Sequence, residues 1–110
     1  MLQLRLMDAH DLPPLEFTPA GIPVSLRPWF QEYRLEDLEP DKHAFTVIER
    51  TLAWGDVREL RWLFARYGSE PLANWVREYG WFFIPRQRFK FWLCFFGIQE
   101  YRHRERIWPY

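Results

Sequence analysis

Apolar side chains recur at helical spacing through most of the chain after residue 40. Phe45, Ile48 and Leu52 follow one another at intervals of three and four residues, and similar stripes begin at Val57 and Leu72. Such intervals place the residues on one face of an α-helix. The pattern predicts helices near residues 40–54, 56–67, 70–79 and 85–96. We therefore expect an all-α fold, a compact bundle of about four helices with an irregular, proline-rich N-terminal arm.

Capping residues set the expected ends of these helices. Pro40, flanked by two acidic residues, predicts a first turn there. Asp56 and Glu59 have the spacing of a capping box, and Ser69 is expected to cap the third helix. Glycines are expected to end the four helices in turn, at Gly55, Gly68, Gly80 and Gly97.

The first 28 residues differ from the rest. They contain five of the nine prolines, which do not fit inside helices. Alternating leucines predict a short strand over residues 2–6. We expect an arm at 1–28 that packs on the domain or wraps a partner, a helical domain at 29–98, and a basic, aromatic tail at 99–110.

Aromatic content and charge placement both point to binding. The chain has seven Trp, ten Phe and five Tyr among 110 residues, so we expect some of these rings on the surface. The net charge is zero, but residues 1–60 hold 11 acidic and 6 basic side chains, and residues 61–110 hold 4 and 9. This division fits either two solvated faces or a basic surface for nucleic acid or an acidic protein.

Few residues have the spacing of a chemical site. His10, His43 and His103 lack a second ligand at metal-binding spacing, and no nucleotide-binding or hydrolase motif is present. Cys94 lies within FWLCFFG, an apolar setting that favours a structural role. We expect no catalytic residue, metal site or cofactor, and therefore no enzyme.

The location is expected to be cytoplasmic. The N-terminus is too charged for a signal peptide, and the most apolar stretch, residues 89–98, is about half of a membrane span. One cysteine allows no intrachain disulfide, in keeping with a reducing compartment.

The third helix suggests an alternative function. Two short helices joined at Gly68 have the outline of a helix-turn-helix, which would make the chain a small nucleic-acid-binding regulator. However, Glu70 opposes phosphate, and only Asn74 and Arg77 could contact DNA. A plain helical hairpin is the competing interpretation.

The last helix and the tail are the expected contact surface. Residues 89–96 are apolar on every side except at Lys90, and one helix in a small bundle cannot usually bury its whole circumference. The surface would bind a protein partner or a second copy, unless the N-terminal arm covers it. The expected partner-binding residues are Phe89, Trp92, Phe95, Tyr101, Arg102, Arg104, Arg106, Trp108 and Tyr110.

A series of residues, in order and spacing, resembles a known family. It comprises Leu38, His43, Phe45, Ile48-Glu49-Arg50, Leu52, Gly55-Asp56, Arg61-Trp62-Leu63, Tyr67-Gly68, Phe91-Trp92 and Gly97-Ile98. Over residues 26–98 the chain resembles a small prokaryotic helical domain family of unknown function. It departs from that family's pattern at Gln31-Glu32 and at Lys90. The resemblance implies a compact helical domain that is often encoded beside abortive-infection-type nucleotidyltransferase toxins. It therefore favours a protein-binding module, antitoxin-like or an accessory subunit of such a toxin.

Overall fold

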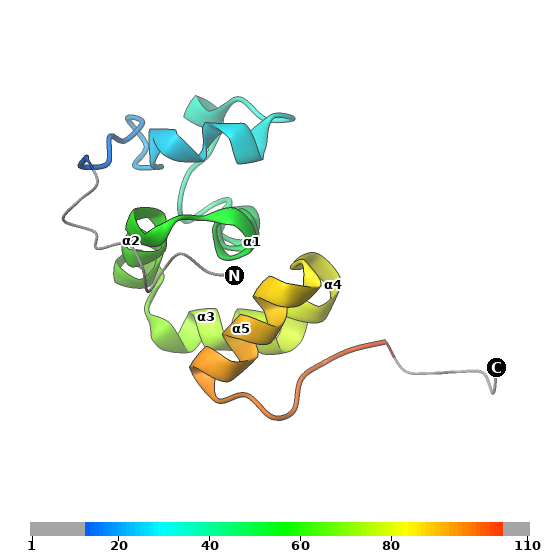
Figure 1. Cartoon of the computed structure of the whole chain (residues 1–110). Helices are drawn as coiled ribbons and strands as arrows, with labels where there is room; N and C mark the ends of the chain where they lie inside the picture. The colour runs from blue at the N-terminus through cyan, green and yellow to red at the C-terminus, as the bar shows by residue number, and fades with distance from the viewer. Residues whose placement is uncertain (1–12, 105–110) are drawn as a thin grey trace.

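Residues 13–104 are described by the computed structural model, and they form helices joined by short turns. Figure 1 shows three tiers, with the 3-10 helices η3 and η4 on one side of α1 and α2, and with α3, α4 and α5 on the other. The elements are η3 (Val24–Phe30), η4 (Leu35–Asp37), α1 (Ala44–Trp54), α2 (Val57–Tyr67), α3 (Ser69–Trp75), the π-helix η5 (Val76–Gly80), α4 (Trp81–Phe83) and α5 (Arg86–Phe96).

The expected all-α class is confirmed for the described part of the chain. Between residues 13 and 104 the only extended pairing is an isolated antiparallel bridge between Phe17 and Pro23. The strand expected at residues 2–6 lies outside the described residues.

Helix α1 starts at Ala44, so the expected start near Pro40 is wrong. The segment before α1 is held as a turn by two bonds that sequence spacing does not show. The hydroxyl of Tyr67 donates to the Pro40 carbonyl over 2.6 Å. The backbone N–H of Glu39 donates to Nδ1 of His43 over 2.9 Å. The backbone N–H of His43 still donates to the Glu39 carbonyl over 2.8 Å, so this segment forms a single helical turn that precedes α1.

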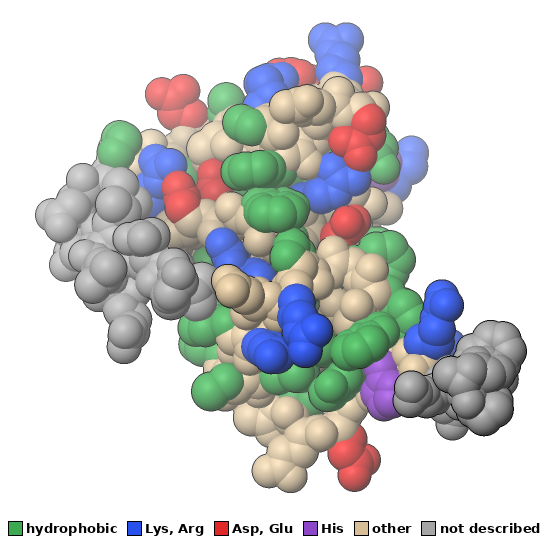
Figure 2. Space-filling view, turned by 45° about the vertical axis from the view of Figure 1, so that its right-hand side comes forward, with side chains coloured by type: hydrophobic (Ala, Val, Ile, Leu, Met, Phe, Trp, Pro, Cys, Tyr) green, Lys and Arg blue, Asp and Glu red, His purple; other side chains and the backbone are tan. Residues whose placement is uncertain are grey.

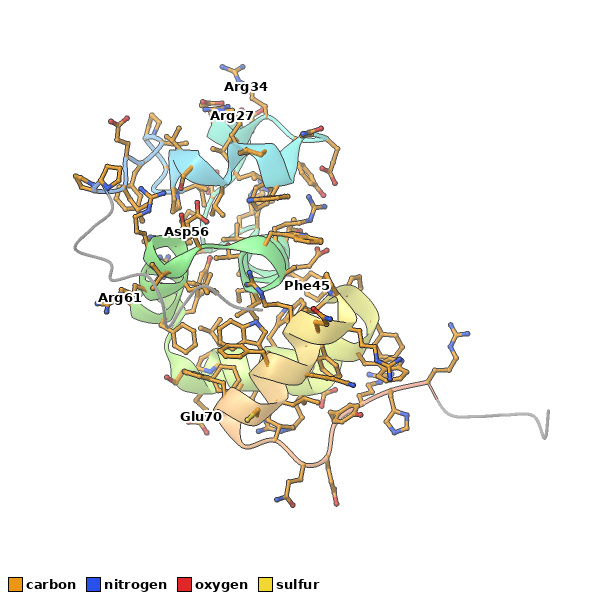
Figure 3. The ribbon with its side chains drawn as sticks, viewed as in Figure 1. Arg27, Arg34, Phe45, Asp56, Arg61 and Glu70 are labelled. Carbon is orange, nitrogen blue, oxygen red and sulfur yellow. The ribbon has the colours of Figure 1, made fainter. Side chains whose placement is uncertain are left out.

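The capping box at the start of α2 is confirmed. The Asp56 carboxylate accepts the backbone N–H of Glu59 over 2.9 Å, and the Glu59 carboxylate accepts the backbone N–H of Asp56 over 2.8 Å. Asp56 stands at this helix start in Figure 3. Glu59 is buried, and its second oxygen accepts the hydroxyl of Ser25. The box therefore also ties η3 to α2.

The third predicted helix does not end at Gly80. The chain continues from α3 through the wider turn of η5 into α4. Gly80 serves packing instead, because a Cβ there would lie 2.7 Å from the Phe89 ring. Ser69 is not the cap of α3 either, since it is the first helical residue after Gly68, whose φ is +90°. Gly97 does end α5, in the left-handed conformation.

The core extends into the segment expected to be an arm. Ile22, Leu26 and Phe30 have no exposed surface and belong to the same cluster as Val47, Leu52 and other buried residues of the helices. The domain boundary expected between residues 28 and 29 falls inside η3. The described part of the arm thus packs on the helices.

The end of α1 is bound to α5 through side chains. The indole N–H of Trp92 donates to the Leu52 carbonyl over 2.9 Å. The Arg88 guanidinium donates to the carbonyls of Leu52 and Gly55 over 3.0 and 3.2 Å. These carbonyls are left without helical partners at a C-terminus, where a cation is also favoured. Burial lowers the pKa of Arg88 from its usual value.

Candidate protein interface

Helix α5 has an inner and an outer side. Phe89 and Trp92 are only 4% and 2% exposed and belong to the core. Phe95 is 57% exposed, and Lys90 and Cys94 are exposed as well. Two of the expected partner-binding residues, Phe89 and Trp92, are therefore covered by the chain's own helices. The remaining outer side carries the candidate interface.

The expectation of an apolar environment for Cys94 is wrong, because its side chain is exposed. Its neighbours in the sequence, Leu93 and Phe95, are apolar, but Cys94 lies two residues after Trp92 and so nearly opposite to it on the helix. Since Trp92 faces the core, Cys94 faces away from it.

One hollow lies between α4, α5 and the segment that follows α5. We call it the aromatic hollow; its volume is about 320 Å³, and it is lined by Trp81, Ile84, Arg86, Phe89, Lys90, Leu93 and Tyr101. Three of its rings contact one another. The Tyr101 centroid lies 5.1 Å from that of Phe89 and 6.2 Å from that of Trp81. The rings of Phe89 and Trp81 are 6.3 Å apart.

The segment after α5 is fixed in place beside this hollow. The backbone N–H of Arg102 donates to the Arg77 carbonyl over 2.8 Å, and its guanidinium lies 3.8 Å from Glu78. Tyr101 is thereby held half-buried, while Arg102 and Arg104 are exposed. The expected contact residues Arg106, Trp108 and Tyr110 lie outside the described residues.

A second hollow lies on the other side of α5, against the end of α1. We call it the α1–α5 hollow; its volume is about 700 Å³, and it is lined by Ala53, Trp54, Pro85, Gln87, Arg88, Lys90, Phe91 and Cys94. Trp54 is 46% exposed and stacks on Trp29 of η3, with centroids 5.4 Å apart. This stacking orients the Trp54 indole, which forms one wall of the hollow.

Both hollows are basic. No carboxylate lines either one, whereas Arg86, Arg88 and Lys90 do. Lys90 lines both and so stands on the ridge between them. Figure 2 shows basic side chains in the middle of one face with hydrophobic side chains around them, and acidic ones mainly in its upper part.

Acidic side chains lie together in a third hollow, near η4 and the start of α1, which we call the acidic hollow. Its volume is about 750 Å³, and four carboxylates line it, from Glu36, Asp37, Glu39 and Asp41. Two of these are paired with arginines. The Arg27 guanidinium holds the pKa of Glu36 at about 2, and Arg66 forms an ion pair with Asp41.

The helix pair expected as an alternative nucleic-acid site consists of α2 and α3, which contact each other and are joined at Gly68. Arg61 is exposed on α2, and Glu70 stands in the first turn of α3 (Figure 3). The guanidinium of Arg77 donates to the side-chain oxygen of Asn74, so the two polar residues expected to contact DNA bond to each other.

Residues 13–104 have neither a metal-binding cluster nor a membrane-spanning helix. Over this range, no group of three or more His, Cys, Asp or Glu side chains could hold a metal ion. None of the helices formed by these residues has the length and apolarity needed to cross a membrane.

Comparison with known proteins gives one match. Residues 26–76 match a family of unknown function, DUF6922, so the chain is similar to that family from η3 to the start of η5. No curated protein and no solved structure matches the chain. The matched range ends before α4 and α5 and includes, of the two basic hollows, only Ala53 and Trp54.

Proposed function

We propose that this chain is a protein-binding module that acts by binding rather than catalysis. It would be an antitoxin-like or accessory subunit of a nucleotidyltransferase toxin. Its contact surface is the outer side of α5 with the two hollows beside it. The observation that carries the proposal is that aromatic and basic side chains line both hollows, with no carboxylate among them.

The composition of this surface is that of a binding site for a protein. Trp, Tyr and Arg are the residues most enriched at the energetic centres of interfaces, where apolar pockets receive anchors and a polar rim surrounds them. Trp54, Trp81 and Phe95 are exposed here, and Arg86 and Lys90 supply the rim. A partner with apolar anchors and acidic neighbours fits this arrangement.

The partner's identity is drawn from the family resemblance, since related domains are often encoded beside nucleotidyltransferases. We propose that the partner is a nucleotidyltransferase of the kind that the resemblance implies, or else a second copy of the chain. The complex would form in the cytoplasm, where an exposed thiol such as Cys94 stays reduced.

Nucleic acid is the alternative partner. Its binding would depend on cations free to meet phosphate groups. On this surface, Arg88 is bound to carbonyls of α1 and Arg102 lies beside Glu78. Arg86 and Lys90 remain without ion pairs among residues 13–104, so it is the apolar lining of the hollows, and not a lack of cations, that favours the protein partner.

The test is the dissociation constant of the purified chain with a nucleotidyltransferase from the same host. Lys90→Glu is expected to weaken binding about tenfold or more, because it reverses the charge between the hollows. Lys42→Glu, the same change at an exposed site before α1, is the matched control and should alter binding less than about twofold. Equal effects of the two substitutions would refute the proposed surface.

A second pair of variants tests the apolar part. Phe95→Ser should weaken the complex, and Phe17→Ser, which alters a ring 48% exposed near the acidic hollow, should not. The nucleic-acid alternative is tested on the same samples. Tight binding of DNA or RNA that falls steeply with salt would replace the protein proposal.

A further inference from the structure

The lining of the aromatic hollow indicates which chemical group it binds. This inference rests on the proposed function and adds to it the chemistry of the partner's contact. We propose that it binds one aromatic or large aliphatic side chain of the partner whose neighbours in the sequence are carboxylates. The apolar group would enter the hollow, and the carboxylates would meet Arg86 and Lys90 at its rim.

The size and walls of the hollow suit a single side chain. Its volume of about 320 Å³ stands at the lower end of the range of roughly 300–1,000 Å³ typical of ligand sites. Its apolar lining comes from α4, α5 and the segment after α5, so three parts of the chain enclose the guest. An aromatic ring seated there would meet Trp81, Phe89 and Tyr101, and ring pairs of this kind are favourable beyond the area that they bury.

The side chains at the bottom of the aromatic hollow are held in place before a guest binds. Phe89 is buried, and its ring approaches Gly80 more closely than any Cβ would permit. Tyr101 is placed by the backbone bond from Arg102 to Arg77. A guest therefore meets walls that already have their bound positions, which lowers the entropic cost of binding.

The basic residues at the rim of the hollow determine which charge the neighbours of the guest should carry. Arg86 and Lys90 are exposed, and neither has an ion-pair partner among residues 13–104. With no carboxylate in the lining, the hollow has a positive potential that attracts acidic neighbours and repels basic ones.

A methylated ammonium group is the competing guest, since aromatic cages bind such cations. Here, however, the three rings contact one another instead of standing apart around an open centre. The two cations of the rim also oppose a positive guest. The hollow therefore favours an apolar group with negative neighbours.

Three blocked peptides test this with the full chain. They are acetyl-Phe-Glu-Glu-amide, acetyl-Phe-Lys-Lys-amide and acetyl-Ala-Glu-Glu-amide, so that charge and ring are varied separately. The readout is the NMR shift of the Trp81 indole N–H, identified by its loss in Trp81→Phe. We expect the first peptide to shift this signal in a saturable way and the other two to bind about tenfold more weakly.

Variants of the chain locate the effect. The double substitution Arg86→Gln and Lys90→Gln should weaken the first peptide about tenfold, while Lys42→Gln should leave its affinity unchanged. Leu93→Trp should fill the hollow and abolish the shift, with the helical circular dichroism of the chain checked in parallel. Tighter binding of the lysine peptide, or equal binding of all three, would overturn the inference.

Failure of this inference is distinguishable from failure of the proposed function. If the acidic peptide does not bind but Lys90→Glu still breaks the complex with the nucleotidyltransferase, the surface is correct and the chemistry of the hollow is wrong. If the peptide binds and the complex ignores Lys90→Glu, the hollow is a genuine site outside that interface.

Discussion

The two ends of the molecule use their charged side chains differently. In the N-terminal framework, residues 22–76, arginines are bound to carboxylates of the same chain, as in Arg27–Glu36, Arg50–Glu32 and Arg66–Asp41. In the C-terminal aromatic layer, residues 77–104, the only ion pair is between Arg102 and Glu78, at 3.8 Å. The framework uses its charges to hold itself together, whereas the layer leaves cations available to another molecule.

Exposed rings occur in both regions, with Trp29, Tyr33 and Trp54 among those of the framework, but they are denser along the layer. The leucines of the framework are fully buried or nearly so. In the layer, Trp81, Phe82, Phe83 and Phe95 are each about half exposed or more. Rings of the framework also reach across to the layer. Phe45, labelled in Figure 3, packs against Phe83 of α4 with centroids 5.3 Å apart, and Phe64 packs against Phe95 of α5 with centroids 5.7 Å apart. The comparison teaches that aromatic abundance here exceeds what folding requires.

The largest expected effect is a difference in stability between a core residue of the framework and an exposed residue of the layer. Leu63→Ala in α2 removes a side chain with no exposed surface and should lower the free energy of unfolding by about 3 kcal/mol. Phe95→Ala in α5 should lower it by only about 1–2 kcal/mol, because its ring is 57% exposed although it contacts the rings of Phe64 and Trp92. Urea unfolding of both variants measures the difference. Equal losses would mean that the layer is as much a part of the folding core as the framework.

A smaller effect is expected where the two regions join. Trp92→Phe keeps a buried ring but removes the N–H that donates to the Leu52 carbonyl. We expect a loss of about 1–2 kcal/mol in the free energy of unfolding, because that carbonyl keeps only its bond from Arg88. Urea unfolding again gives the value. No loss would show that α1 and α5 are held together by packing alone.

Loss of the cap of α2 tests the framework by itself. Asp56→Ala should cost about 1 kcal/mol of unfolding free energy, as is usual for an N-cap. Asp37→Ala, at an exposed carboxylate in η4, is the matched control and should cost less than about 0.5 kcal/mol. Thermal unfolding compares the two. Binding of a partner to α5 should be unaffected by either variant.

The smallest expected effect is a pH dependence at Tyr67. Burial raises the pKa of this half-buried phenol to about 12 from its ordinary value of 10. Because the pKa is higher in the folded chain, the stability contributed is full below about pH 10 and is lost as the pH rises toward 12. With its partial exposure, the loss should be less than about 1 kcal/mol. Unfolding of the wild type and of Tyr67→Phe, compared at several alkaline pH values, isolates it; parallel curves would contradict the assignment.

Local features of the fold could be predicted from the sequence, and distant pairings could not. The capping box of Asp56 and Glu59 lies within four residues, so its spacing alone identifies it. Gly80 has the same local signature as Gly97, but its role depends on Phe89, nine residues later. The burial of Ile22 and Leu26 likewise depends on helices much further along the chain.

The candidate site shows the same limit. Sequence composition pointed to α5 and the tail, but it could not separate the inner residues Phe89 and Trp92 from the outer Phe95. The sequence did not indicate Trp54. Its place on this surface depends on its stacking against Trp29, which lies 25 positions earlier in the chain. The cations that lack ion pairs could not be predicted from composition, because they depend on where the fold places the acidic side chains.

The accessibility of Cys94 tests the central claim most directly, namely that the outer side of α5 is the contact surface. It is the single cysteine of the chain, is exposed, and lines the α1–α5 hollow. Its alkylation by a maleimide, followed by intact mass with and without the nucleotidyltransferase, should slow about tenfold or more in the complex. A thiol placed at the control site, in the double variant Cys94→Ser and Lys42→Cys, should react at the same rate in both. An unchanged rate at Cys94 within a formed complex would contradict the claim.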